Sequence, residues 1–171
     1  NVISDADYKF LKAQLKADGY DEWYFIVWFM AATGARVSEL LHIKAEHVQI
    51  GYLDLYSKGG KIRRLYIPKN LRIEAMKWLK DKGVTSGYIF LNRFGDRITT
   101  RGIAQQLKHF AEKYGMKNVH RSDGICHQLM TEAGYVKPGN IVFGTDSHTT
   151  TYGCVGAFSS GIGYTEMASI L

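Results

Sequence analysis

Thr33-Gly34-Ala35-Arg36-Val37-Ser38-Glu39-Leu40 separates two apolar helical patterns and decides how the first part of the chain folds. Gly34 interrupts the pattern that precedes it, because glycine readily adopts the backbone conformation that ends a helix. A short new helix is expected over residues 37–43. Glu39 falls in its first turn, where a glutamate stabilises the helix end or orients a nearby arginine such as Arg36.

Two helices are expected before this stretch, since apolar residues recur there at helical spacing. Ser4 can cap the first helix, which ends at Gly19. The second helix opens with an acidic turn at Asp21 and is apolar on nearly every side over residues 23–30. This pattern indicates a helix buried within the domain, and its aromatic residues are expected in the core rather than on a base-stacking surface.

The spacing of apolar residues then changes from helical to alternating. Residues 48–55 and 62–67 predict two strands, joined by Ser57-Lys58-Gly59-Gly60-Lys61 as a hairpin with a basic tip. Three more elements are expected downstream: a helix from Asn70, a short strand over residues 88–91, and a helix capped by Thr100 that runs through Tyr114. The predicted fold of this part is mainly α with a small antiparallel β-sheet, an α+β class.

Charge divides the chain near residue 120. Residues 1–120 hold 20 Lys and Arg against 12 Asp and Glu, a balance of +8, whereas residues 121–171 hold two against four, a balance of −2. Glycine also becomes more frequent in the second segment, as is typical where turns replace helices. We therefore divide the chain into residues 1–120 and residues 121–171, and expect the second segment not to be an independent domain. The basic first segment is compatible with a polyanion partner and equally with a solvated lysine-rich surface.

Composition also bears on membranes, compartment and metals. The longest apolar run, residues 23–32, has about half of the ~20 residues needed to cross a bilayer, so no membrane partner is expected. The two cysteines, Cys126 and Cys154, are too few for a disulfide framework, which favours reduced thiols and a cytoplasmic location. His42 and His47 have no partner at metal-ligand spacing, and no metal site is predicted.

With this order of elements, residues 33–40 resemble the first signature box of the tyrosine recombinases, the phage integrase family, and the resemblance extends over residues 1–119. It implies the catalytic-domain fold of that family, double-stranded DNA as the partner, and DNA strand cleavage and rejoining in DNA integration and recombination. Arg36 matches the arginine that grips the negatively charged phosphorane with two parallel hydrogen bonds. Lys58 matches the lysine that protonates the leaving 5′ oxygen, with Lys61 as the second choice.

Other basic residues of the hairpin are expected to contact DNA. Lys61, Arg63 and Arg64 can neutralise neighbouring phosphates, and the glycines would let the tip bend toward a DNA backbone. In isolation, the segment would be interpreted as an ordinary glycine turn with solvated lysines. Its position after Arg36 favours the DNA-binding interpretation, and a homo-oligomer on DNA is also compatible with the resemblance.

The second half of the recombinase signature is not found. The family continues with a box of the form His-x-x-Arg-His, whereas this chain has His120-Arg121-Ser122-Asp123-Gly124, with Asp123 where an arginine is needed. Tyr152 follows at too short a spacing to match the nucleophilic tyrosine. Because covalent strand cleavage needs that nucleophile, we expect a catalytically incomplete, DNA-binding part of a recombinase, and enzyme activity stays an open question.

A second resemblance covers residues 124–171. Its blocks are Gly124-Ile125-Cys126-His127-Gln128, Lys137-Pro138-Gly139, Gly144-Thr145-Asp146-Ser147-His148-Thr149, Gly153-Cys154-Val155-Gly156-Ala157-Phe158 and Gly161-Ile162-Gly163. In this order they resemble the aconitase superfamily, most closely the large subunit of isopropylmalate dehydratase or homoaconitase. The resemblance implies an incomplete α/β fragment of that fold and makes the chain an apparent chimera.

The aconitase resemblance also implies a pocket. His127, Asp146, Ser147 and His148 match residues that line the substrate and iron–sulfur pocket, where they position carboxylates and shuttle protons. Without the resemblance, residues 146–148 would be a turn with a capping side chain, because adjacency in sequence does not make a catalytic triad. The implied [4Fe–4S] cluster needs cysteine thiolates, three in this family, and neither cysteine here matches them. We therefore expect a vestigial pocket and no bound cofactor.

Three functions from different classes remain open at this point. The first is DNA binding by a partial recombinase, which we favour for the larger part of the chain. The second is a fragment of an iron–sulfur hydro-lyase of the isopropylmalate dehydratase or aconitase type. The third is an artificial fusion with no selected function.

Overall fold

The computed structural model divides into two units, residues 2–119 and residues 120–171, the latter together with Asn1. The structure describes residues 5–56, 62–116, 125–144 and 146–162. Within these described ranges no helix is long and apolar enough to cross a membrane.

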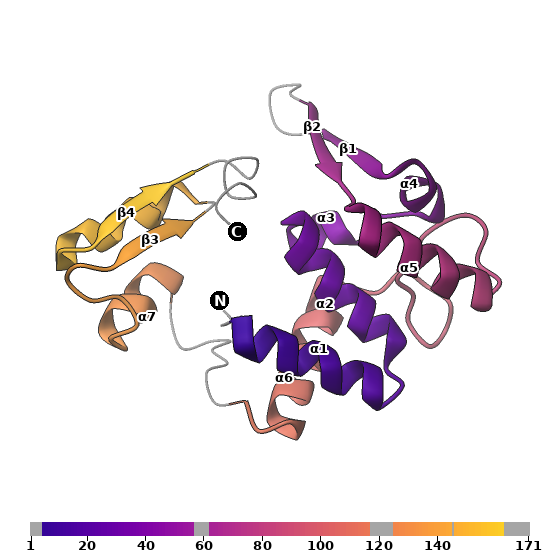
Figure 1. The fold of residues 1–171 in the computed structure, drawn as a ribbon, viewed down its shortest axis with the longest axis horizontal. Coiled ribbons are helices and arrows are strands. Elements are labelled where there is room, and N and C mark those ends of the chain that lie inside the picture. Colours follow the sequence, from indigo (N-terminus) through magenta and orange to yellow (C-terminus); the bar gives the residue numbers. More distant parts are fainter. Residues whose placement is uncertain (1–4, 57–61, 117–124, 145, 163–171) are drawn as a thin grey trace. The chain divides into compact units, whose positions relative to one another are not determined.

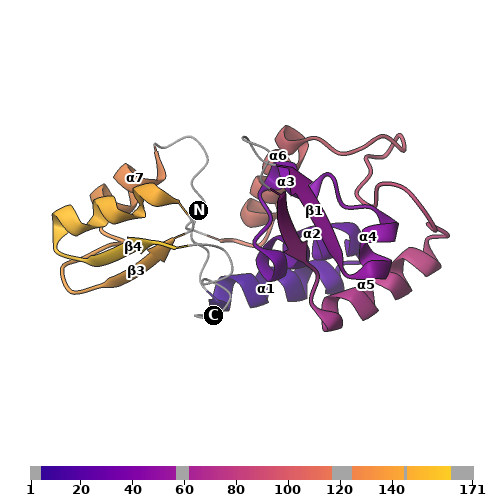
Figure 2. The ribbon, with the colours of Figure 1, turned by 90° about the horizontal axis from the view of Figure 1, so that it is seen from above.

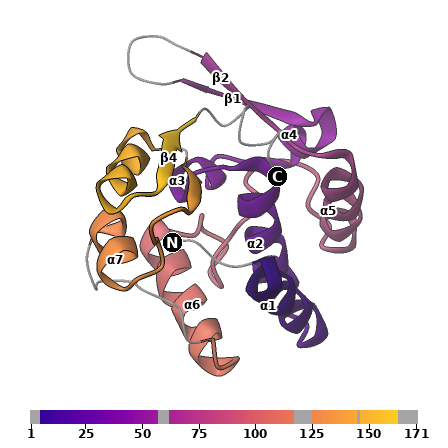
Figure 3. The same cartoon turned by 60° about the vertical axis from the view of Figure 1, so that its left-hand side comes forward.

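The first unit is mainly helical (Figure 1). Its helices are α1 (Asp5–Ala17), α2 (Asp21–Thr33), α3 (Val37–Leu40), α4 (Ala45–Ile50), α5 (Lys69–Asp81) and α6 (Thr100–Lys113). Strands β1 (Tyr52–Tyr56) and β2 (Ile62–Tyr66) pair antiparallel, with Tyr52 opposite Tyr66 and Asp54 opposite Arg64. Figure 3 shows this hairpin leaving the helices from the end of α4. The mainly helical fold with a small antiparallel sheet confirms the prediction for this part.

The core of the first unit surrounds α2. Five α2 side chains are buried, and Phe25 stacks on Trp78 of α5 with ring centroids 4.6 Å apart. Phe29 meets Phe90 edge to face at 5.6 Å, an arrangement that aromatic rings prefer. The other side chains with almost no exposure are Leu15, Ile26, Leu40, Ile43, Val48, Leu65, Leu71, Ile103 and Phe110. The expectation that the aromatic residues of this helix lie in the core is therefore confirmed.

Two predicted strand segments differ in the structure. Val48 and Ile50 belong to α4 rather than to a strand, because the helix is capped at its start by His47 and ended by Gly51 at φ 90°. The His47 Nδ1 accepts the Lys44 backbone N–H at 3.0 Å, and Val48 turns into the core. Residues 88–91 form isolated bridges instead of a strand, since Tyr88 pairs with Lys44 and Leu91 pairs with Arg97.

The helix predicted to begin at a Thr100 cap begins one residue earlier than expected. The hydroxyl oxygen of Thr99 accepts the Gly102 backbone N–H at 3.0 Å, so Thr99 is the cap. The remaining helix predictions agree with α1, α2 and α5 within a few residues. The short helix after Arg36 is α3, which ends at Leu40 rather than at residue 43.

The second unit contains α7 (Cys126–Glu132), β3 (Ile141–Gly144), the 3-10 helix η1 (Ser147–Val155) and β4 (Phe158–Gly161). β3 and β4 pair parallel. Figure 2 shows η1 between α7 and this strand pair. Among the residues that the structure describes in this unit, the buried hydrophobic side chains are Val136, Tyr152 and Ala157.

Glycines permit a close backbone approach beside η1. A Cβ built on Gly161 would lie 2.6 Å from the Asp146 carbonyl oxygen and 2.9 Å from the Ser147 Cα. A Cβ on Gly144 would lie 2.2 Å from the Thr149 Oγ1. Larger residues at either position would push η1 away from the strands, so these glycines fix where Asp146 stands.

Candidate functional site

A tight turn between α2 and α3 presents Arg36. The Thr33 hydroxyl donates to the Phe29 carbonyl at 2.6 Å, and Gly34 closes α2 at φ 62° with its N–H bonded to the Met30 carbonyl. This is the left-handed cap that glycine adopts without a Cβ penalty. Arg36 then stands in extended conformation at the start of α3, and its side chain is 65% exposed.

Glu39 joins Arg36 to Arg63. The Arg36 backbone N–H donates to Glu39 Oε2 at 2.8 Å, and the Arg36 Nη1 lies 3.4 Å from Oε1. From β2, the Arg63 Nη1 donates to both carboxylate oxygens, at 2.8 and 3.0 Å, and its Nη2 donates to the Gly34 carbonyl at 3.4 Å. The Glu39 side chain is only 15% exposed, so these charge-assisted bonds hold it firmly. The expected capping role of Glu39 is thus confirmed.

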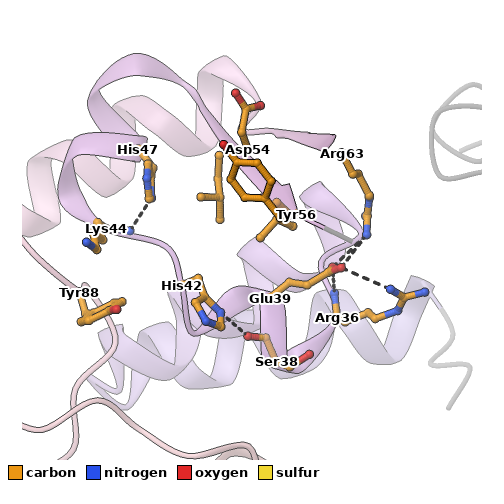
Figure 4. Close-up of a pocket in the computed structure, with 12 residues that line it drawn as sticks. Arg36, Ser38, Glu39, His42, Lys44, His47, Asp54, Tyr56, Arg63 and Tyr88 are labelled. Atoms are coloured by element: carbon orange, nitrogen blue, oxygen red, sulfur yellow. Dashed lines mark hydrogen bonds and ion pairs between the residues drawn. The ribbon is translucent and has the colours of Figure 1, made fainter. Parts of the chain in front are cut away.

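These side chains border a cavity of about 780 Å³ within the first unit (Figure 4). It is lined by Arg36, Ser38, Glu39, His42, Lys44, His47, Leu53, Asp54, Leu55, Tyr56, Arg63 and Tyr88. Three of the lining side chains carry positive charge and two are carboxylates. The residues come from α3, α4 and the segments next to them, from the hairpin, and in the case of Tyr88 from the loop after α5, so the cavity exists only when these parts pack together.

The hairpin supplies a second ion pair. Arg64 donates to Asp54 through Nε at 2.7 Å and Nη2 at 2.8 Å, a bidentate geometry. The hydrogen bonds from Arg64 lower the pKa of Asp54, and those to Asp54 raise the pKa of Arg64. Because Asp54 is neutralised in this way, the cavity presents less negative charge than its composition suggests.

The structure places three of the five predicted DNA-contacting residues. Arg36 reaches the cavity, Arg63 contacts Glu39, and Arg64 contacts Asp54. Lys58 and Lys61 lie outside the described residues. The roles predicted for all five stay predictions.

The second unit brings together residues that are far apart in sequence. The Asp146 carboxylate is shared by two imidazoles, with His127 Nε2 at 3.2 Å and His148 Nδ1 at 2.9 Å. Its Oδ1 also accepts the His148 backbone N–H at 3.2 Å and lies 3.5 Å from the Ser147 hydroxyl. Hydrogen bonds from His148, first from its side chain and then from its backbone, and from His127 lower the pKa of Asp146.

The cysteines do not fit an iron–sulfur cluster. The sequence holds Cys126 and Cys154, and both are free and exposed. The Cys126 Sγ lies 3.8 Å from the Tyr152 hydroxyl, and burial together with this contact raises the pKa of Tyr152 to about 12. A cluster of the four-iron type needs more thiolates than these two.

Sequence reasoning missed the partner of Glu39 and part of the cavity wall. Arg63 stands 24 residues after Glu39, and no local spacing rule joins a helix turn to a strand at that distance. Arg63 and Arg64 are neighbours in β2, so their side chains lie on opposite faces of the hairpin. His47, for which the sequence indicates no metal-binding partner, lines the cavity and caps α4.

The fold has a counterpart among solved structures. A solved structure, the crystal structure of XerA recombinase, is similar to this chain with a TM-score of 0.57, at 21% sequence identity over 77% of this chain and 49% of that one. At this identity the similarity concerns the fold alone.

The family of the chain is shown by its sequence. The chain belongs to the aconitase family (aconitate hydratase), whose family model matches residues 76–171, more than half of its length. The "Probable 3-isopropylmalate dehydratase large subunit" of Methanosarcina mazei is 50% identical over 64 residues, 37% of this chain and 15% of that protein. The "Probable methanogen homoaconitase large subunit" of Methanothermobacter thermautotrophicus is 47% identical over 120 residues, 70% of this chain and 24% of that protein.

The chain therefore spans about a sixth to a quarter of the length of these relatives. The family match begins at Met76, inside α5 of the first unit. A junction between two origins near residue 120 stays a prediction.

Proposed function

We propose that the first unit binds duplex DNA by holding a phosphodiester at the cavity beside Arg36, as the DNA-binding part of a site-specific tyrosine recombinase. The observation that carries the proposal is the Arg36–Glu39–Arg63 cluster at the mouth of a basic cavity, in a unit with a recombinase fold. Assembly as a homo-oligomer on DNA and a cytoplasmic location belong to the same proposal.

The arrangement of charges supports phosphate binding at Arg36 rather than at Arg63. Arg63 is 23% exposed and gives two short bonds to Glu39, whereas the Arg36 side chain is 65% exposed and its Nη1 contact with Glu39 is longer. A guanidinium binds a phosphate with two parallel N–H donors, which Arg36 can direct outward while its backbone remains anchored. Arg63 then acts as a positioning residue, because it fixes the carboxylate that orients Arg36.

Chain geometry is compatible with Lys58 acting at the same phosphate. Tyr56, the last described residue of β1, lines the cavity. Lys58 follows two residues later, and two residues span at most about 7 Å of extended chain. The leaving-group role of Lys58 is part of the proposal.

Cleavage of the DNA strand is not part of the proposed function. A transferred phosphoryl group in this chemistry needs a second arginine and a tyrosine nucleophile, and the sequence assigns neither. Position 123, where the arginine is needed, is an aspartate and lies outside the described residues. The proposed activity is binding without turnover.

Fluorescence anisotropy of a labelled duplex, measured with the full chain at several salt concentrations, tests the proposal. Arg36→Ala and Lys58→Ala should each weaken binding by about tenfold, the loss expected for one charge-assisted contact, and lower the salt slope by about one. Arg101→Ala, which removes an exposed arginine of α6 outside the cavity, is the matched control and should retain the native affinity. Native affinity in both Arg36→Ala and Lys58→Ala at low salt would disprove the proposal, and circular dichroism of each variant excludes unfolding as the cause of a loss.

A second candidate function is favoured by the family match over residues 76–171. In it, the chain is a fragment of an aconitase-family hydro-lyase that keeps the polar pocket of His127, Asp146, Ser147 and His148. Iron analysis and visible absorbance after anaerobic reconstitution test it, because a retained cluster would absorb in the visible range. We expect no stoichiometric iron, since two cysteines cannot hold the cluster.

A further inference from the structure

Two imidazoles and one carboxylate converge at one surface of the second unit. His127 comes from α7, Asp146 is the N-cap of η1, and His148 lies in its first turn. One ligand atom from each residue can be chosen so that all three lie within 4.8 Å of one another. The cluster is thus assembled by the packing of α7 against η1 and not by sequence adjacency alone.

In this cluster the His127 side chain is largely buried, whereas the side chains of Asp146 and His148 are accessible to solvent. His127 is 19% exposed and its ring stacks near His148 at 5.6 Å and contacts the buried Tyr152 at 5.8 Å. Asp146 and His148 are 56% and 73% exposed, so an ion can reach their ligand atoms from solvent. The backbone of Asp146 is held by the close approach of Gly161.

We propose that His127, Asp146 and His148 bind one divalent transition-metal ion of the zinc class, with water completing the coordination. Imidazole nitrogen and carboxylate oxygen are the ligands that zinc, cobalt and nickel share. Metal–ligand bonds of about 2.0–2.2 Å require ligand atoms closer together than the upper separation found here. Because Asp146 and His148 are exposed, small rotations of their side chains can supply that contraction.

A bound metal ion must replace the hydrogen bonds that His127 and His148 make with Asp146. Each imidazole that donates to Asp146 must present a lone pair instead, so a metal ion displaces N–H protons into solvent. The His127 Nδ1 is buried without a hydrogen-bond partner among the described residues. Metal-bound histidines usually donate that second nitrogen to an acceptor, so we expect moderate affinity, with a Kd on the order of micromolar.

The test is a titration of the full chain with CoCl2, followed by visible absorption, and with ZnCl2, followed by calorimetry. We expect one ion per chain and displacement of cobalt by zinc. His148→Gln and Asp146→Asn should each weaken binding by at least about tenfold, because each removes a direct ligand. His109→Gln, which removes a single exposed histidine of α6, is the matched control and should bind as the native chain does.

His148 is the sharpest position for the test, since its exposed side chain can be replaced without opening the core. Equal affinity in His148→Gln and the native chain would overturn the site, as would an equal loss in His109→Gln. Absence of stoichiometric binding at about 100 µM metal would also overturn it. The inference does not depend on DNA binding, and its failure leaves that proposal untouched.

Discussion

Glu39 accepts from two arginines that come from different elements, and this one carboxylate links the α2–α3 turn to the hairpin. The local half of the arrangement could be predicted from sequence, because a glutamate three residues after Arg36 is a capping position. The distant half could not, since the pairing with Arg63 depends on where β2 packs. The same reason hides the His127–Asp146 contact, which joins residues 19 apart.

Removing the Glu39 carboxylate should destabilise the first unit. Glu39→Ala leaves the Arg36 backbone N–H and the partly buried Arg63 without this acceptor, and should lower the free energy of unfolding by about 1–3 kcal/mol. Glu39→Gln keeps an acceptor oxygen and should lose less. Urea denaturation measures both variants. Asp54→Ala, which breaks the more exposed pair with Arg64, is the control and should lose less than Glu39→Ala; the reverse order would contradict the central role of Glu39.

Among the elements, α4 is a short helix whose apolar pattern also predicts the start of a strand. Val48 and Ile50 are two residues apart, which is the spacing of a strand face, and the helix has only one buried side chain at that end. The hydrogen bond from the Lys44 backbone N–H to His47 stabilises the helical conformation. Because histidine is not among the usual cap residues, the sequence does not indicate this bond. The glycines at 34 and 51 were the stronger signals, since both end helices with positive φ.

Because His47 caps α4 as an acceptor, stability should depend on its protonation. Burial, followed by the charge of Lys44, lowers the pKa of His47 from its ordinary 6.5. A histidine with a lowered folded pKa contributes stability that is complete above the unfolded pKa and is lost as pH falls through the folded value. The free energy of unfolding should therefore decrease as the pH falls below about 6.5. His47→Gln should reduce this decrease in urea denaturation, and an unchanged pH profile in that variant would rule out the cap as its source.

The packing of β4 against η1 in the second unit can be tested at Gly161. Gly161→Ala places a Cβ against the backbone of Asp146 and Ser147, so η1 must shift and the His127–Asp146–His148 cluster must open. We expect a lower melting temperature and weaker cobalt binding. Gly134→Ala tests the alternative that replacing any glycine of this unit weakens cobalt binding. A Cβ at Gly134 would meet no atom within 4 Å, although its φ of 71° is unfavourable for alanine. Stronger loss of cobalt binding in Gly134→Ala than in Gly161→Ala would contradict the packing argument.

At the scale of the whole molecule, the two units differ in how much apolar surface they bury. The first has a core built from all its described helices, whereas α7 has no buried side chain and the described residues of the second unit include three buried hydrophobic ones. Amide hydrogen exchange should therefore be faster in α7 than in α6, since local opening costs less where few apolar contacts are lost. Equal protection of the two helices would contradict this.

The family match and the division of the chain into two units have different limits. The aconitase-family match reaches back to Met76, while the second unit starts at residue 120. Composition indicates that the two ends of the chain differ and that the change falls near residue 120, but a change in charge and glycine content does not establish that two origins are joined there. Reading the coding DNA across codons 117–124 should show whether one continuous reading frame joins the two parts.

The most direct measurement is a titration of isotope-labelled full chain with duplex DNA, followed by amide chemical shifts. Binding at the Arg36 cavity should move the signals of α3 and β1, including Ser38 and Tyr56, and leave the C-terminal turn of α5 unchanged. Shifts confined to the second unit, or no shifts at low salt with DNA in excess, would contradict DNA binding at this cavity.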